Sequence, residues 1–95
     1  MKQDIYDKLK AVKPILRERF GIEEFAVFGS FAKGKEDDNS DIDIAILKMN
    51  LKSGYGMIQA QYYLESVLER NIDIGSFKAM KTFIQNRIKK DFVYV

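Results

Sequence analysis

The sequence predicts an α/β (α+β) fold in which a small mixed sheet of three to four strands is flanked by helices. Apolar residues recur at helical spacing in several stretches, and short apolar runs bounded by glycine or polar residues lie between them. Helices that alternate with short strands pack as layers around a shared core. The chain has 95 residues, 46% of them apolar, which argues against disorder. We therefore expect residues 1–95 to form a single domain.

The first twenty residues are expected to be helical, but not as one continuous helix. Pro14 lacks a backbone N–H and fits best in the first turn of a helix. This predicts a bend near Lys13, a second helix from Pro14 to Phe20, and Gly21 as its left-handed cap. Four apolar residues mark the helical spacing: Ile5, Leu9, Val12 and Leu16.

The middle of the chain reads as two strands separated by a loop. Residues 25–28 form a short buried strand that Gly29 closes, and the polar, acidic residues 35–40 form a loop. Residues 40–47 form the second strand, and residues 48–56 are a polar connection to the next element.

The rest of the chain, from Met57 on, is expected to contain a helix, a strand, a second helix and a short terminal strand. The first of these helices begins at Met57 and ends near Arg70, and residues 71–74 form the strand. The turn at Gly75 and Ser76 then starts the last helix, with Ser76 as N-cap, and residues 92–95 add the terminal strand. The buried face predicted for the last helix consists of Phe77, Met80, Ile84 and Ile88.

Composition excludes several classes of protein. No apolar run approaches the roughly 18 residues of a membrane span, and the N-terminus has no secretory h-region. The absence of cysteine excludes disulfides and favours a cytoplasmic location, and the absence of histidine removes the commonest general base. The net charge of +2 is too small to predict direct binding of nucleic acid.

The most informative pattern is a glycine-serine turn followed by a strand with two aspartates. Residues 29–34 (Gly-Ser-Phe-Ala-Lys-Gly) predict a tight turn into a short helix, whose free N–H groups suit a phosphate. Residues 41–46 (Asp-Ile-Asp-Ile-Ala-Ile) predict a strand with Asp41 and Asp43 on one face. Aligned carboxylates beside a phosphate site indicate a nucleotide bound together with magnesium.

Other interpretations of these residues are possible. The aspartates could form the solvent face of an edge strand, Ser30 could only cap the short helix, and Asp73 could be a solvated residue at a strand end. An EF-hand starting at Asp37 is excluded because its sixth position is Ile42 instead of glycine. A P-loop is excluded because no Gly-Lys-Ser/Thr sequence is present.

The pattern Gly29-Ser30-x-x-Lys33-Gly34 followed by Ser40-Asp41-Ile42-Asp43 resembles the signature of the DNA polymerase β-like nucleotidyltransferases. In length and element order the chain is similar to the minimal nucleotidyltransferases, many of which are antitoxins paired with HEPN-domain toxins. The resemblance covers roughly Pro14 to the C-terminus, and it implies a nucleotidyltransferase-like fold.

The resemblance also implies roles for individual residues. Asp41 and Asp43 would ligate two Mg²⁺ or Mn²⁺ ions, and Asp73 would help to bind one of them and take the proton of the acceptor. Gly29, Ser30 and Lys33 would hold the β- and γ-phosphates of the nucleotide. Many relatives carry arginine at the position of Lys33, so a bidentate phosphate contact becomes a point-charge contact in this chain.

Two functions follow as hypotheses. By resemblance, the chain transfers AMP from ATP to a hydroxyl of a partner, with a tyrosine of a HEPN-domain toxin as the leading acceptor. Alternatively, it neutralises a toxin by contact without catalysis. A chain this short is expected to leave no second domain to enclose an acceptor, so a partner would supply that surface; homo- and hetero-oligomers both remain open. Five basic residues near the C-terminus are expected to form a solvated helix face, with contact to protein or RNA as the alternative. They are Lys78, Lys81, Arg87, Lys89 and Lys90.

Overall fold

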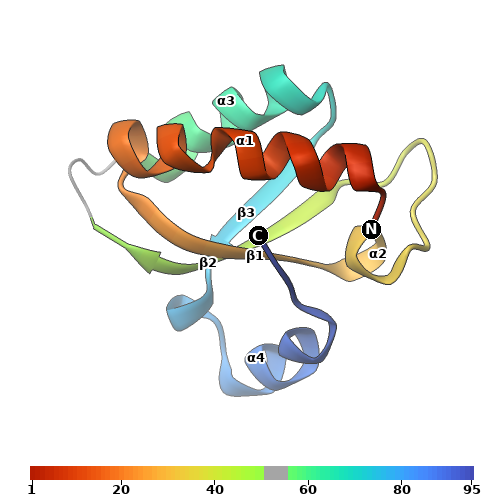
Figure 1. Cartoon of the computed structure of the whole chain (residues 1–95). Helices are drawn as coiled ribbons and strands as arrows, with labels where there is room; N and C mark the ends of the chain where they lie inside the picture. Colours follow the sequence, from red (N-terminus) through yellow and green to blue (C-terminus); the bar gives the residue numbers. More distant parts are fainter. Residues whose placement is uncertain (51–55) are drawn as a thin grey trace.

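The computed structural model describes residues 1–50 and 56–95, and it has the predicted α/β architecture (Figure 1). The elements follow one another as α1 (Gln3–Phe20), β1 (Ile22–Phe28), α2 (Gly29–Lys33), β2 (Ile42–Met49), α3 (Gly56–Leu68), β3 (Ile72–Ser76), the 3-10 helix η1 (Phe77–Ala79), α4 (Thr82–Ile88), the 3-10 helix η2 (Lys89–Asp91) and β4 (Val93–Tyr94).

The four strands form one mixed sheet in the order β3-β2-β1-β4. β1 pairs antiparallel with both β2 and β4, whereas β2 and β3 are parallel. Parallel neighbours require a crossover connection, and α3 provides it. The predicted mixed sheet with a short terminal strand is therefore confirmed.

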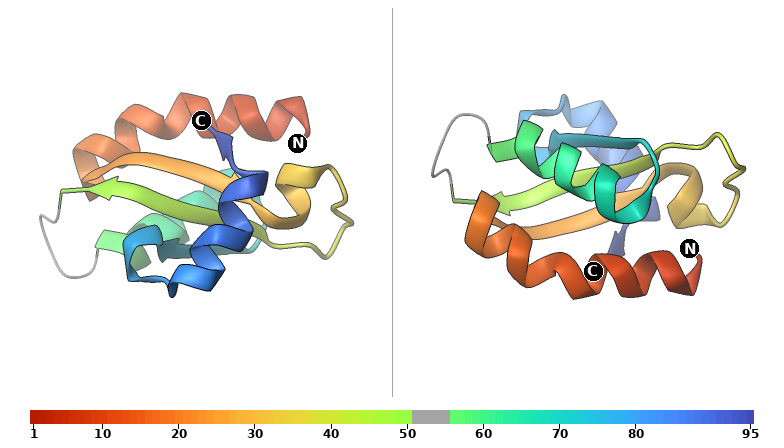
Figure 2. Two further views of the ribbon diagram at one scale, coloured as in Figure 1. Left: turned by 90° about the horizontal axis from the view of Figure 1, so that it is seen from below. Right: turned by 90° about the horizontal axis from the view of Figure 1, so that it is seen from above.

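Helices α1 and α3 cover one face of the sheet, which we call the upper face (Figure 1). The hydrophobic core lies between these helices and the sheet, where Phe25 from β1 is only 2% exposed. Segment η1–α4–η2 lies against the opposite, lower face, and the view from below shows it crossing the sheet beside α2 (Figure 2). The lower face is thus only partly covered.

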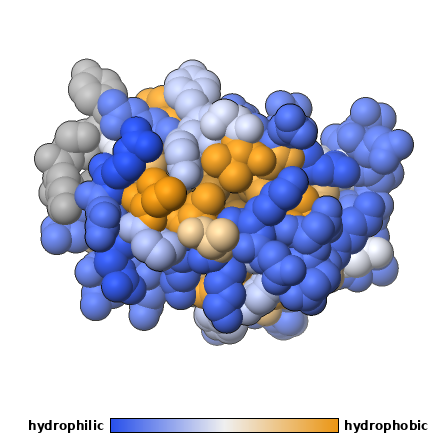
Figure 3. Space-filling model, turned by 45° about the horizontal axis from the view of Figure 1, so that its top comes forward, coloured by the Kyte–Doolittle hydropathy of each residue, from blue (hydrophilic) through white to orange (hydrophobic). Residues whose placement is uncertain are grey.

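The outer side of α1 and α3 is mostly hydrophilic, with an apolar area near its centre (Figure 3). Ile15 and Val67 on these helices are partly buried against the core, while Ile58 on α3 is 54% exposed. Among the described residues, no helix is both long and apolar enough to cross a membrane.

Helix α1 differs from the prediction because it continues through Pro14. The predicted separate helix from Pro14 to Phe20 is wrong, because α1 is one helix from Gln3 to Phe20. Pro14 itself is exposed, and the buried face of α1 runs without interruption from Ile5 to Phe20. Continuous burial of that face compensates for the hydrogen bond that proline cannot donate. Gly21 is the predicted left-handed cap, with φ 73°.

The bounds of the strands and of the last helix also differ. β1 begins at Ile22 instead of residue 25, because the buried side chain of Ile22 extends the strand toward Gly21. β2 begins at Ile42, so Ser40 and Asp41 precede it, and the strand continues to Met49. Most of the predicted 48–56 connection, residues 51–55, lies outside the described residues.

The last helix differs from the prediction because it is not continuous. Ser76 occupies the predicted N-cap position, but of the 3-10 helix η1, which ends at Ala79. Ser76 still belongs to β3, because its strand pairs with Ile46 of β2, and the Ser76 side chain makes no capping hydrogen bond. The chain then forms η1 and resumes as α4 at Thr82. Of the predicted buried face, Ile88 is 7% exposed, and the other three residues, Phe77, Met80 and Ile84, are only partly buried.

Candidate active site

The glycine-serine turn lies where β1 ends and α2 begins. Gly29 has φ 76°, a left-handed conformation that glycine adopts at low cost, and Gly34 ends the short helix with φ 72°. The Ser30 carbonyl accepts a hydrogen bond of 2.9 Å from the Lys35 amide. The sequence therefore forms the tight turn and short helix that the glycine spacing predicts.

The side chain of Asp43 packs directly against this turn. A Cβ atom added to Gly29 would overlap Asp43 Oδ2 and lie 3.3 Å from its Cγ. Gly29 is needed both for its positive φ and for the close approach of this carboxylate. The two halves of the sequence pattern, separated by the loop before β2, are thus in direct contact in the structure.

The predicted acidic residues lie along the lower face of neighbouring strands. Asp43 and Asp73 are register partners across the parallel β2–β3 pair, so their backbones lie about 4.8 Å apart. Asp41 precedes Asp43 by two residues and lies just before β2. On the other side, Phe28 is the partner of Asp43 in β1. Asp41 and Asp73 are exposed, whereas Asp43 is partly buried.

The electrostatics of Asp43 show that these carboxylates interact. Burial raises the pKa of Asp43 above its ordinary value of 3.8, and the negative charges of Asp73 and Asp41 raise it further. A bound cation would oppose this effect, because it would favour the charged form of Asp43. The raised pKa of Asp43 therefore reflects its partial burial and the two negative charges beside it.

The donor set fits a hard divalent cation. Carboxylate oxygens are the ligands that magnesium and manganese prefer in proteins. Within residues 1–50 and 56–95, however, no three acidic side chains are gathered closely enough to form a complete metal centre. Two of the three aspartates, Asp41 and Asp73, are exposed to solvent. The residues fit the ion chemically, and the arrangement is open.

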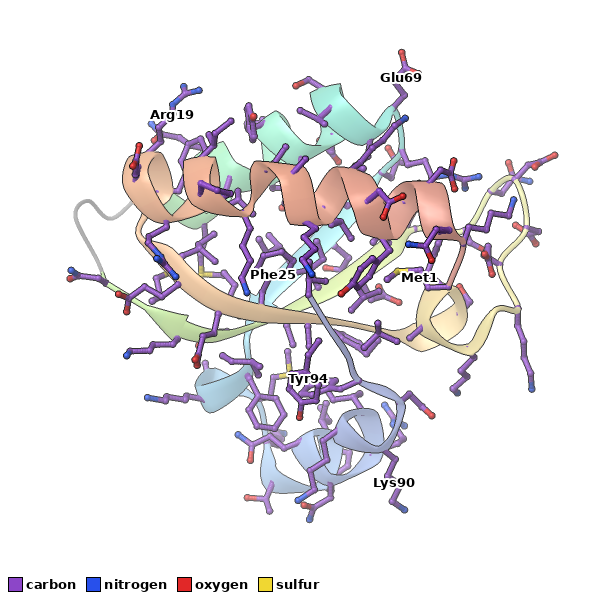
Figure 4. The ribbon with its side chains drawn as sticks, viewed as in Figure 1. Met1, Arg19, Phe25, Glu69, Lys90 and Tyr94 are labelled. Atoms are coloured by element: carbon purple, nitrogen blue, oxygen red, sulfur yellow. The ribbon has the colours of Figure 1, made fainter. Side chains whose placement is uncertain are left out.

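Lys33 is on α2 as predicted, but it has a partner that the sequence did not reveal. Its Nζ lies 3.3 Å from Asp91 Oδ2 in η2, and the two side chains are 47% and 33% exposed. Asp91 is 58 positions from Lys33 and lies among basic residues, so no local spacing indicated this pair. All five members of the predicted basic set are exposed, and Figure 4 shows Lys90 directed away from the sheet.

The loop before β2 is held by its own side chains. The Asp37 amide donates to Ser40 Oγ at 2.9 Å, and the Ser40 hydroxyl donates to Asp37 Oδ1 at 3.2 Å. The Asn39 amide also donates to Asp37 Oδ1, at 2.8 Å. Ser40 is therefore a turn residue and not the first residue of the strand, and this turn fixes the chain immediately before Asp41.

Glu65 and Arg70, at and just after the end of α3, hold the start of β3 and the loop before β2 in place. The sequence analysis did not identify either residue. Glu65 Oε2 accepts a 3.1 Å hydrogen bond from the Ile72 amide at the start of β3. The Arg70 guanidinium lies 4.8 Å from the centroid of the Phe31 ring and donates to the Asp37 carbonyl at 3.3 Å. A polar recess of about 410 Å³ opens beside these contacts, lined by Asp38, Asn39, Ser40, Glu65, Glu69, Arg70 and Asn71.

Comparison with known sequences gives consistent results. Residues 10–94 match the family described as polymerase beta, nucleotidyltransferase. The protein adenylyltransferase MntA of Thermococcus cleftensis is 34% identical over 98% of this chain and 94% of that protein. A relative in Methanocaldococcus jannaschii that bears a protein adenylyltransferase name is 30% identical over 97% of this chain and 95% of that protein.

Comparison with solved structures supports the same fold. A chain described as a candidate minimal nucleotidyltransferase superposes with a TM-score of 0.78 at 20% identity, covering 98% of this chain and 95% of that one. The complex of a tri-AMPylated Shewanella oneidensis HEPN toxin with MNT antitoxin contains a chain that superposes with a TM-score of 0.71 at 18% identity, covering 99% of this chain and 71% of that one. Family members transfer nucleotides and generally use divalent metal ions. This chain belongs to the polymerase-beta-type nucleotidyltransferase family and is a homologue of the MntA protein adenylyltransferase.

Proposed function

We propose that residues 1–95 act as one domain that transfers AMP from ATP to a tyrosine hydroxyl of a partner HEPN-domain toxin, as a cytoplasmic antitoxin. The observation that carries this proposal is the contact between the Asp43 carboxylate and Gly29, which joins the acidic residues to the predicted phosphate turn. Two relatives bear protein adenylyltransferase names, and a chain of the same fold occurs in a complex with an AMPylated HEPN toxin.

In this proposal the acidic side chains hold the metal ions. Asp41 and Asp43 ligate two Mg²⁺ or Mn²⁺ ions, and Asp73 contributes to one of the two sites. Bound metal ions supply positive charge that orients the triphosphate and makes the acceptor hydroxyl more acidic. The raised pKa of Asp43 supports this assignment, because an uncompensated carboxylate cluster attracts a cation.

The remaining residues bind the nucleotide and move one proton. The backbone and hydroxyl of the Gly29–Ser30 turn, together with Lys33, hold the β- and γ-phosphates. The acceptor oxygen forms a bond to the α-phosphorus, the bond from that phosphorus to the α–β bridging oxygen breaks, and pyrophosphate leaves. Asp73 takes the proton of the acceptor hydroxyl, a role compatible with its exposed position beside Asp43.

The proposal is tested by weighing the partner. The protein is incubated with Mg-ATP and a HEPN-domain protein encoded by a neighbouring gene, and the partner is analysed by intact mass spectrometry. We expect added AMP units with the wild type and a loss of about 10³-fold or more in rate with Asp41→Asn or Asp43→Asn. The matched control is Asp4→Asn, which removes an exposed carboxylate from the first turn of α1 and is expected to leave transfer unchanged.

A second candidate function is neutralisation by contact alone. It is favoured by the exposure of Asp41 and Asp73 and by the absence, among the described residues, of a complete three-carboxylate metal centre. In that case the partner is bound and inhibited without a change of mass, and inhibition persists in both Asn variants. Inhibition that requires ATP and is lost in those variants would exclude this alternative.

A further inference from the structure

The ion pair between Lys33 and Asp91 joins two segments that are distant in sequence. Lys33 is the last residue of α2, and Asp91 is the last residue of η2. Their 3.3 Å contact brings the C-terminal segment against the short helix that follows the predicted phosphate turn. In the view from below, these segments lie side by side (Figure 2).

Asp91 is held in place by the aromatic residue that follows it. The Phe92 ring lies 6.3 Å from the Phe28 ring, 5.4 Å from Phe77 and 5.8 Å from Tyr94, measured between centroids. Figure 4 shows Tyr94 on the lower side of the sheet, toward α4. Phe28 immediately precedes Gly29, so the contact that anchors Asp91 also packs against the start of the predicted phosphate turn.

A lysine in this position gains from such a partner. Its side chain is a flexible four-carbon stem with a point charge and lacks the preorganised planar fork of arginine. Because the Lys33 side chain is 47% exposed, without a partner its ammonium group would sample many positions in solvent. A carboxylate at 3.3 Å restricts that range while leaving donors of the ammonium group available to a second anion.

We propose that Asp91 is a positioning residue that holds the Lys33 ammonium group in reach of the nucleotide phosphates. The inference rests on the proposed function, since it assumes that Lys33 contacts phosphate. Asp91 itself does not touch the nucleotide. Its removal therefore weakens binding of the triphosphate while the chemical step continues at nearly the wild-type rate.

The first test uses Asp91→Asn, which removes the charge with almost no change of shape. Binding of AMP-PNP with Mg²⁺ is measured by calorimetry, and KM for ATP and kcat are measured in the transfer reaction. We expect Kd and KM to rise on the order of two- to fivefold, the range that a partly exposed ion pair permits. We expect kcat to stay within about twofold of the wild type, because Asp91 acts on ground-state binding. Asp91→Glu keeps the charge and should restore most of the affinity, and Asp4→Asn is the charge-matched control.

The second test asks whether Asp91 acts through Lys33. Lys33→Ala should weaken AMP-PNP binding, and adding Asp91→Asn to it should cause no further loss. An unchanged or tighter Kd in Asp91→Asn would overturn the inference, the latter because it would show that Asp91 competes with phosphate. Independent, additive losses would overturn it as well. A wild type that binds no nucleotide would refute the proposed function, whereas a failure confined to Asp91→Asn refutes only the role of Asp91.

Discussion

The two faces of β2 differ in burial and charge, although their residues alternate along the same strand. Ile42, Ile44 and Ile46 on the upper face are 0–2% exposed beneath α1 and α3. The lower face carries Asp43, with Asp41 immediately before the strand. A shift of one residue in register would exchange these two sets, so burial of the isoleucines also fixes where the carboxylates point.

The upper face of β2 contributes to the stability of the fold, whereas the lower face carries the residues proposed for catalysis. The isoleucines contribute free energy of folding through burial of apolar surface. Asp43 opposes folding near neutral pH, because it is partly buried beside two like charges, which is why its pKa is raised. Such destabilising groups are typical of functional sites and persist because other parts of the fold compensate for them.

The largest expected effects come from substituting two neighbouring residues of β2, one on each face. Ile44→Ala should lower the free energy of unfolding by about 2–5 kcal/mol, because it leaves a cavity in the core. Asp43→Asn should leave the fold intact and abolish transfer. Denaturant unfolding and the mass assay measure both properties, and Ile44→Val, at about 0.5–1.5 kcal/mol, is the graded control. Unfolding of Asp43→Asn would show that this aspartate is structural.

The next effect is stabilisation by ligand at the lower face. A nucleoside triphosphate with magnesium or manganese that binds only the folded protein should add about 2.7 kcal/mol at a hundred times Kd. Thermal melts with and without Mg-ATP measure this gain. Ile44→Val should retain it, since its change lies in the core, whereas Asp41→Asn should lose most of it. The absence of any shift at saturating concentrations would contradict the site.

Much of the fold follows from local sequence, and its exceptions have a common cause. The alternation of isoleucine and aspartate in residues 41–46 predicted the orientation of β2, and Gly21 predicted the end of α1. The helix break predicted from Pro14 and the side-chain cap predicted from Ser76 are both absent. Each prediction rested on a strong local signal that long-range packing overrides. Pro14 lies on the exposed side of a helix whose buried face is continuous, and Ser76 pairs with Ile46 across the sheet.

Only those parts of the candidate site that lie within short, continuous stretches of sequence could be predicted. Residues 29–34 and 41–43 predicted a turn and two carboxylates, and family resemblance added Asp73 at the position that pairs with Asp43. The roles of these residues remain predictions. The contacts of Lys33 with Asp91 and of Arg70 with Phe31 and Asp37 depend on how separate elements pack, so no spacing in the sequence could indicate them.

A smaller effect is expected from substitutions that disturb the contact between Gly29 and the Asp43 carboxylate. Gly29→Ala and Gly34→Ala both place alanine at a positive φ, which costs about 1 kcal/mol or somewhat more. Only the new Cβ at position 29 would overlap the Asp43 carboxylate, since nothing lies within 4 Å at position 34. Gly29→Ala should therefore be less stable than Gly34→Ala and also weaken Mg-ATP binding. Equal effects of the two substitutions on stability and binding would mean that the Asp43–Gly29 contact has no consequence.

The smallest effect concerns the charge of Asp43 itself and depends on pH. Because the pKa of Asp43 is higher in the folded protein than its ordinary value of 3.8, the folded state binds its proton more tightly than the unfolded state. Asp43 therefore costs no stability below 3.8, and the cost develops as pH rises through the folded-state pKa.

Asp43→Asn should raise Tm by about 2–4 °C near neutral pH, since partial exposure screens the repulsion, and the gain should vanish in acid. The comparison is the difference in Tm between wild type and variant at each pH, with Asp4→Asn as the control for removing a surface charge. Added Mg²⁺ should reverse the sign near neutral pH, because the ion stabilises the wild-type carboxylates and not the amide. A gain that persists below 3.8 would show that the carboxylate is unfavourable for a reason other than its charge.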